Sequence, residues 1–272
     1  MSRQRRAVAL RMLCAFLWVA PAAQAADLSF KDDVRPSAWI IELGGYGVFE
    51  PTYEGSKHYG VSFKPLLDFH QSGDKVWMSF PNDALSYDLY ETSNFHAGPA
   101  ASVTLKSRYH GDDVDLSLGK AEVNLEGGAF AEYYPVENVR MRVEFLQGIA
   151  GNNGFAFNLS ADYIWHPYAD WTLTIGPRAQ IVNDQYASEY FSTQLAQKNH
   201  RYVSYHAEGG VLSTGAEFTG VYDWTKTIST KVFVDYNQLM GDAADSPRVN
   251  LKGSTDQVTV GVGASYKFTI ER

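Results

Sequence analysis

Hydrophobic and polar residues alternate with a period of two along most of the chain. In residues 256–270 the apolar positions are Val258, Val260, Val262, Ala264, Tyr266, Phe268 and Ile270. Successive side chains of a β-strand point to opposite faces, so this segment predicts a strand with one apolar and one polar face. The same pattern recurs in residues 39–43, 59–69, 123–133, 139–145, 155–165, 171–181, 212–224 and 228–236. No helical period persists after residue 26.

The polar faces of these predicted strands carry charges of both signs. They include Glu42, Lys64, Asp68, Asp162, Arg178, Lys231, Asp235 and Lys267. A soluble sheet would bury apolar residues on that side, whereas a membrane barrel encloses a polar lumen and turns its apolar face to lipid. The pattern therefore predicts an all-β fold, a transmembrane antiparallel up-and-down β-barrel over residues 38–270.

The connections between the predicted strands alternate in length, as is typical of outer-membrane barrels. The turns expected at the periplasm are short: 71–74, 92–94, 135–138, 166–170 and 223–225. Most of the connections expected outside are longer: 50–58, 107–120, 150–153, 183–210 and 241–255. This alternation sets the direction of every strand.

Segment 75–91 decides the number of strands. The preceding strand ends at the periplasm and the following one starts there, so the segment forms either a hairpin or no membrane strand. We favour a short hairpin around Pro81, Asn82 and Asp83, which makes twelve strands, with ten as the alternative. The outward residues of this hairpin are expected to be Val76, Met78, Phe80, Leu85, Tyr87 and Leu89.

Aromatic residues gather at one end of the predicted strands. Trp39, Trp165, Trp171, Trp224, Tyr266 and Phe268 all lie at strand ends that the loop pattern assigns to the periplasmic side. Amphipathic rings favour the level of the lipid headgroups. These residues therefore predict an aromatic girdle at the periplasmic edge of the membrane.

The first 25 residues have the pattern of a cleaved secretory signal peptide: a basic start, a short apolar run and small residues at Ala23 and Ala25. Residues 26–37 are then expected to be a periplasmic N-terminal segment. Cys14, the only cysteine, lies within this leader. The mature chain is therefore predicted to have no disulfide and no thiol chemistry.

The charge balance excludes further classes of protein. The formal net charge is −8, or about −12 without the four arginines of the leader. No basic cluster is present, so no nucleic-acid partner is expected. No apolar run long enough for a membrane helix follows the leader, which argues against a helical inner-membrane protein.

Two groups of residues resemble fragments of catalytic or metal sites. His110, Asp112 and Asp113 could activate water in an outer loop, but no second pair is apparent for the facing rim. His200, His206 and Glu208 lack the spacing of a tight set of metal ligands. We therefore predict no enzyme activity, no cofactor and no bound metal.

Acidic and basic residues lie side by side on the lumen face of two predicted neighbouring strands. They are Glu122, Glu126, Glu132, Arg140, Arg142 and Glu144. One interpretation is a charged constriction that selects ions. The other is a ladder of ion pairs that fills a narrow lumen, in which unpaired charges would be costly. The mixed signs favour the ladder.

Three motifs follow one another along the chain. The first, residues 44–56, contains Pro51, Tyr53, Gly55 and Ser56; the second is Tyr190, Phe191 and Ser192; the third, residues 239–247, contains Gly241, Asp242, Ser246 and Pro247. With the closing Tyr266-Lys267-Phe268, they resemble the MipA/OmpV family of outer-membrane proteins, also called MltA-interacting proteins. Gly, Asp and Pro in the third motif favour a bend, and we expect the first and third motifs to brace outer loops rather than contact a ligand.

The resemblance implies a location in the outer membrane of a Gram-negative bacterium, with membrane lipid as a partner. It also implies a non-enzymatic scaffold that links a murein lytic transglycosylase to a penicillin-binding synthase. Other members of the family resemble porins or adhesins. The alternatives are therefore a narrow small-solute channel, or an adhesin that binds through outer loops such as the aromatic segment 184–210.

Overall fold

The computed structural model describes residues 38–71, 80–107, 121–151, 153–196 and 202–271. The predicted signal peptide, 1–25, and the predicted periplasmic segment, 26–37, lie outside these residues. None of the helices described is long and apolar enough to span a membrane.

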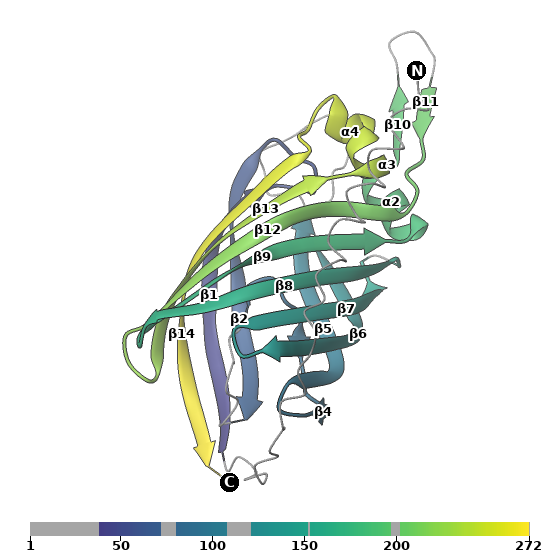
Figure 1. Ribbon diagram of the computed structural model, residues 1–272. Helices are drawn as coiled ribbons and strands as arrows, with labels where there is room; N and C mark the ends of the chain where they lie inside the picture. The colour runs from purple at the N-terminus through teal and green to yellow at the C-terminus, as the bar shows by residue number, and fades with distance from the viewer. Residues whose placement is uncertain (1–37, 72–79, 108–120, 152, 197–201, 272) are drawn as a thin grey trace, which may run out of the picture. The chain divides into compact units, whose positions relative to one another are not determined.

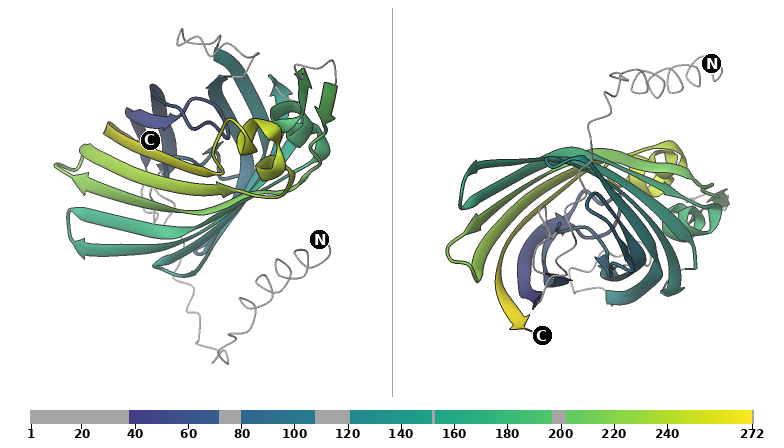
Figure 2. Two further views of the ribbon diagram at one scale, coloured as in Figure 1. Left: turned by 90° about the horizontal axis from the view of Figure 1, so that it is seen from above. Right: turned by 60° about the horizontal axis from the view of Figure 1, so that its bottom comes forward.

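Ten long antiparallel strands make up the barrel wall (Figure 1). They are β1 (Ala38–Pro51), β2 (Tyr59–Gln71), β5 (Phe95–Ser107), β6 (Ala121–Val136), β7 (Val139–Ala150), β8 (Phe155–Tyr168), β9 (Trp171–Val182), β12 (Gly210–Asp223), β13 (Ile228–Leu239) and β14 (Asp256–Glu271). The first strand pairs with the last, because Ala38 lies opposite Glu271 and Phe49 opposite Val260. The predicted antiparallel barrel is confirmed, and Figure 2 shows its strands curving around an interior.

Two very short strands, β3 (Leu85–Ser86) and β4 (Tyr90–Glu91), complete a sheet of twelve. Both pair with β5, and the amides of Tyr87 and Leu89 donate to β5 carbonyls between them. The two strands are therefore one interrupted row beside β5. The predicted number of twelve strands is confirmed, but β3 and β4 form one row rather than two arms of a hairpin. Residues 75–79 of the predicted hairpin lie outside the described residues.

The turn predicted to join that hairpin lies inside the barrel instead. Phe80, expected to face outward, is only 6% exposed, and its ring lies 3.9 Å from the guanidinium carbon of Arg140. In lipid the polar turn residues Asn82 and Asp83 would lack partners, whereas the lumen supplies charged ones. Leu85, Tyr87 and Leu89 are exposed as predicted, and Val76 and Met78 lie outside the described residues.

The alternating pattern separates an apolar outer face from a polar inner face. On β7, Met141, Val143 and Phe145 are exposed, whereas Arg140, Arg142 and Glu144 between them are buried. Large rings also fill parts of the interior. A Cβ on Gly261 would lie 2.1 Å from the Phe233 ring, so this glycine provides the space in which Phe233 is completely buried.

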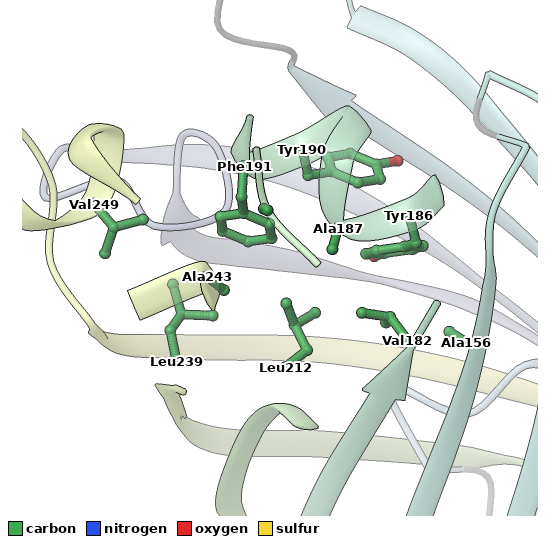
Figure 3. Close-up of a cluster of buried hydrophobic side chains, with 11 residues drawn as sticks. Ala156, Val182, Tyr186, Ala187, Tyr190, Phe191, Leu212, Leu239, Ala243 and Val249 are labelled. Atoms are coloured by element: carbon green, nitrogen blue, oxygen red, sulfur yellow. The ribbon is translucent and has the colours of Figure 1, made fainter. Parts of the chain in front are cut away.

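Short elements lie at the predicted outer end of the barrel. They are α2 (Asp184–Phe191), β10 (Thr193–Ala196), β11 (Tyr202–Tyr205), α3 (Gly241–Asp245) and α4 (Pro247–Asn250). Helix α2 begins after Asn183, whose side chain accepts a hydrogen bond from the Tyr186 amide at 3.1 Å. Apolar side chains of α2, α3 and α4 pack against Val182, Leu212 and Leu239 at the ends of β9, β12 and β13 (Figure 3). This cluster forms an outer cap with its own apolar core.

Candidate functional site

The candidate site is the charged interior of the barrel. Strands β6 to β9 and β12 place their polar side chains there because alternate residues must face away from lipid. The segment Phe80–Ala84, between β2 and β3, adds polar groups from within the lumen. Inner wall and inner segment together build the site.

Arg140 is the centre of the first group of ion pairs. Its guanidinium donates to Glu132 at 2.7 Å, to Asp162 at 3.2 Å, and to Asp83 of the inner segment. Its side chain is only 2% exposed, and that of Asp162 is fully buried. Arg140 therefore joins three strands and the inner segment through charge-assisted hydrogen bonds.

Arg142 holds the inner segment from the same strand. Its Nη1 donates to Glu132 at 3.1 Å, and its Nε donates to Glu144 at 2.8 Å. Glu144 accepts the backbone amide of Ala84 at 3.0 Å, and Arg142 donates to the Ala84 carbonyl at 3.3 Å. The backbone of the inner segment is thus bound by wall side chains that are themselves paired.

Arg178, on β9, extends the network of ion pairs from β8 to β12. Its Nη2 lies 2.7 Å from Asp162 and 3.2 Å from Glu217. Asn82 of the inner segment donates to Glu217 at 2.6 Å. The inner segment is therefore attached to β12 as well as to β7.

A second buried ion pair joins β1 and β13, with a hydrogen bond from β14. Lys231 Nζ lies 2.7 Å from Glu42, both side chains are almost completely buried, and Ser265 donates to the same carboxylate. The rings of Tyr46 and Phe233, 5.4 Å apart in an edge-to-face contact, are buried close by. Charged and aromatic groups are therefore buried on this side of the lumen too.

The predicted charge ladder lies mostly within the first group. Glu132, Arg140, Arg142 and Glu144 are brought together, with Glu132 directly opposite Arg142. Glu126 lies on the same face of β6 nearer the outer end, and the side chain of Glu122 lies outside the described residues. These contacts support the ladder interpretation, which stays a prediction.

Sequence reasoning missed the inner members of the network. Asn82 and Asp83 were expected in a membrane hairpin, yet they pair with Glu217 and Arg140. The available signal was the polar turn Pro81-Asn82-Asp83 within an otherwise apolar segment. A turn of this composition needs water or polar partners, and the lumen provides partners.

The motif residues meet in the outer cap. Gly55, with a φ of +88°, donates its amide to the Gln257 side chain at 3.1 Å and accepts the Ser254 amide at 3.0 Å. Ser56 is completely buried and donates to the His58 carbonyl at 3.0 Å. The first outer loop is therefore fastened to the last one.

The third motif holds the end of helix α2. Ser246 donates to the Phe191 carbonyl at 2.7 Å, and Arg248 donates to the Tyr190 carbonyl. The last carbonyls of a helix lack partners within the helix, and a cation there is favourable. The Tyr190 hydroxyl accepts a hydrogen bond from Asn124 of β6 at 2.7 Å. Helix α2 thus extends from the end of β9 to β6 over the interior.

The remaining motif residues shape the turns around this contact. Pro51 ends β1, and the Tyr53 ring lies 5.3 Å from the guanidinium carbon of Arg248. Gly241 adopts a φ of +54° at the start of α3, and Asp242 accepts the Glu208 amide at 2.9 Å. Pro247 is the first residue of α4. All of these contacts are consistent with bracing.

Replacing Ser246 with alanine is expected to loosen helix α2. The variant leaves the buried Phe191 carbonyl without its donor, which costs about 1–3 kcal/mol locally. Hydrogen exchange followed by mass spectrometry should show faster exchange in residues 184–192 and unchanged exchange in β7. Thr225→Ala, in an exposed turn at the opposite end, is the control. Unchanged exchange of α2 in the Ser246 variant would contradict the bracing role.

The aromatic residues predicted as a girdle lie at one end of the barrel. Trp165, Trp171, Trp224, Tyr266 and Phe268 are exposed there, and Trp39 is half-buried. The Trp224 indole donates to Thr230 at 2.9 Å. Their depth in the membrane stays a prediction.

The fragments of catalytic or metal sites are not assembled in the described part of the chain. His110, Asp112, Asp113 and His200 lie outside it, whereas His206 and Glu208 are exposed beside the outer cap. Among the described residues no group of three or more His, Cys, Asp or Glu side chains is arranged to hold a metal.

Comparison with known proteins gives one family. A family model described as MltA-interacting protein MipA matches residues 43–268. A search of curated proteins gave no match. Among solved structures, the chain is similar to an outer membrane channel from Pseudomonas putida F1, with 14% identity, a TM-score of 0.43, and 92% of this chain and 100% of that chain covered. It is also similar to the NanC porin, with 10% identity, a TM-score of 0.42, and 84% and 100% of the chains covered.

Proposed function

The chain belongs to the MipA family of MltA-interacting proteins, and on this premise we propose that it is a non-conducting scaffold for murein-remodelling enzymes. It is a β-barrel of the outer membrane of a Gram-negative bacterium, with an apolar face toward lipid. The proposed partners are the lytic transglycosylase that the family name specifies and a penicillin-binding synthase. The scaffold itself carries out no reaction.

The burial of charges inside the barrel is the observation that carries this proposal. Arg140, Asp162, Glu217, Lys231 and Glu42 have side chains at most 2% exposed, so solvent scarcely reaches these charges. Burying these charges is costly, and only their mutual pairing compensates for it. A water-filled pathway would hydrate them instead. The geometry therefore favours a protein that acts through its surface.

The end predicted to face the periplasm offers exposed apolar side chains for contact with a partner. Val136, Tyr168 and Trp224, at the tips of three hairpins, are 55%, 74% and 64% exposed. Large exposed apolar residues near one another often mark protein or membrane contacts. We propose that these tips form the docking surface.

Affinity capture tests the proposal directly. Tagged protein from cross-linked cell envelopes should recover a lytic transglycosylase and a penicillin-binding synthase. The matched variant V136S/Y168S/W224S should recover at least tenfold less while remaining folded by its heat-dependent gel mobility. A Y163S variant, changed at a lipid-facing position within β8, is the control. Failure of the unaltered protein to recover either enzyme sinks the scaffold proposal.

A solute channel is the second candidate, favoured by one observation. The inner segment Phe80–Ala84 is held by side chains of the wall and not by a strand ladder, so its removal would open space. Planar bilayers distinguish the two candidates. The scaffold proposal expects no current at either polarity with the unaltered protein, and steady current steps would favour the channel.

A further inference from the structure

The hydrogen-bonded path around the barrel ends at β2 on one side and β3 on the other. Counting antiparallel neighbours around the sheet shows that β2 and the row formed by β3 and β4 run in the same direction. Among the described strands, these are the only neighbours that run parallel to each other. Within the described residues no backbone hydrogen bond joins them. We call this place the seam.

Aromatic rings bridge the seam on the outer face. The Tyr87 ring stacks on Trp39, with centroids 6.4 Å apart and planes 13° apart, and lies 6.0 Å from the Phe69 ring. Tyr87 is 43% exposed. These ring contacts hold the edge of β2 to the row formed by β3 and β4, and the rings continue the lipid-facing surface.

Ionisable groups lie directly behind the rings. Asp88, the neighbour of Tyr87, pairs with His96 Nδ1 at 3.1 Å, and its side chain is still 33% exposed. His70 follows Phe69 and is buried on the inner side. Trp39, Phe69, His70, Tyr87, Asp88 and Glu91 line one small hollow at this place. The hollow therefore brings aromatic rings and ionisable groups together.

We propose that the seam binds one phospholipid whose headgroup carries a primary ammonium. Its acyl chain lies along the rings of Trp39 and Tyr87, continuous with the lipid around the barrel. The ammonium meets the carboxylates of Asp88 and Glu91. A water-soluble ligand would gain nothing from the exposed rings, and a fatty chain alone would gain nothing from the carboxylates.

The position at the predicted periplasmic end matches this chemistry. The rings lie level with the other strand-end aromatics, such as Trp171 and Phe268, where headgroups are expected. A headgroup can reach Asp88 from there without crossing the apolar interior of the bilayer. The acyl chain then follows the outer face of β2.

Lipid retention tests the proposal. Purified barrel would be incubated with vesicles of equal parts phosphatidylethanolamine and phosphatidylglycerol, returned to detergent, and examined by native mass spectrometry. We expect the unaltered protein to keep about one phosphatidylethanolamine and no phosphatidylglycerol. Tyr87→Ala and Asp88→Asn should each reduce retention at least fivefold.

Tyr133 supplies the matched control. It is also 43% exposed and lies near the same end on β6, away from the seam. Tyr133→Ala should keep the lipid. The proposal is overturned if the unaltered protein keeps no lipid, if it keeps phosphatidylglycerol equally well, or if Tyr133→Ala and Tyr87→Ala lose lipid to the same extent. Asp88→Asn keeps the size of the side chain, so it provides a test even if Tyr87→Ala does not fold.

Discussion

Replacing Arg140 with alanine is expected to lower the free energy of unfolding by about 3–5 kcal/mol. Arg140 neutralises Asp83, Glu132 and Asp162 in a space where its own side chain is 2% exposed. The substitution leaves buried carboxylates without their cation. It also removes the contact between the Arg140 guanidinium and the Phe80 ring. Both effects act in the same direction.

Equilibrium unfolding by guanidinium in lipid vesicles, followed by tryptophan fluorescence, measures this loss. Lys226→Ala, in an exposed turn, is the control and should change stability by no more than about 0.5 kcal/mol. A loss below about 1 kcal/mol for Arg140→Ala would contradict the buried network, because solvated ion pairs contribute only that much.

Trimming the inner segment is expected to make a closed barrel conduct. The variant F80A/N82A/D83A removes the ring beneath Arg140 and the side chains that reach Glu217 and Arg140. Water can then enter beside the freed charges, since their hydration compensates for the lost pairs. We expect no current with the unaltered protein and discrete current steps with this variant.

Planar bilayer recordings compare this variant with the unaltered protein. The control is M141A/V143A/F145A, three apolar replacements on the outer face of β7, exposed to lipid, which should remain silent. If the trimmed variant stays closed while folding normally, then the wall side chains suffice to block the lumen and the inner segment is not the plug.

Much of the barrel could be predicted from the sequence because the alternation in each strand is local. Val258, Val260 and Val262 point outward in the structure as their spacing required. A strand register that slipped by one residue would put these side chains among the charges of the lumen. The same argument placed Arg140 and Arg142 inward, although it could not identify all of their partners.

The outer cap shows where local reasoning stops. The motifs were recognisable as loop braces, since Gly241 and Pro247 favour bends. Their actual partners are distant in sequence: Gly55 contacts Gln257, and Ser246 contacts Phe191. Such pairs depend on how the strands close, which no single segment encodes.

The sequence by itself determined the class of fold, the face of each strand that meets lipid and the family. These follow from periodicity and local turn chemistry, which act over a few residues. Only the tertiary structure decided that Phe80–Ala84 enters the lumen, that Arg140 gathers carboxylates from three separate segments, and that β2 meets β3 without a ladder. The physical reason is that a buried polar group takes whichever partner the closed barrel brings within reach, and that partner is set by strand order and curvature rather than by neighbouring residues.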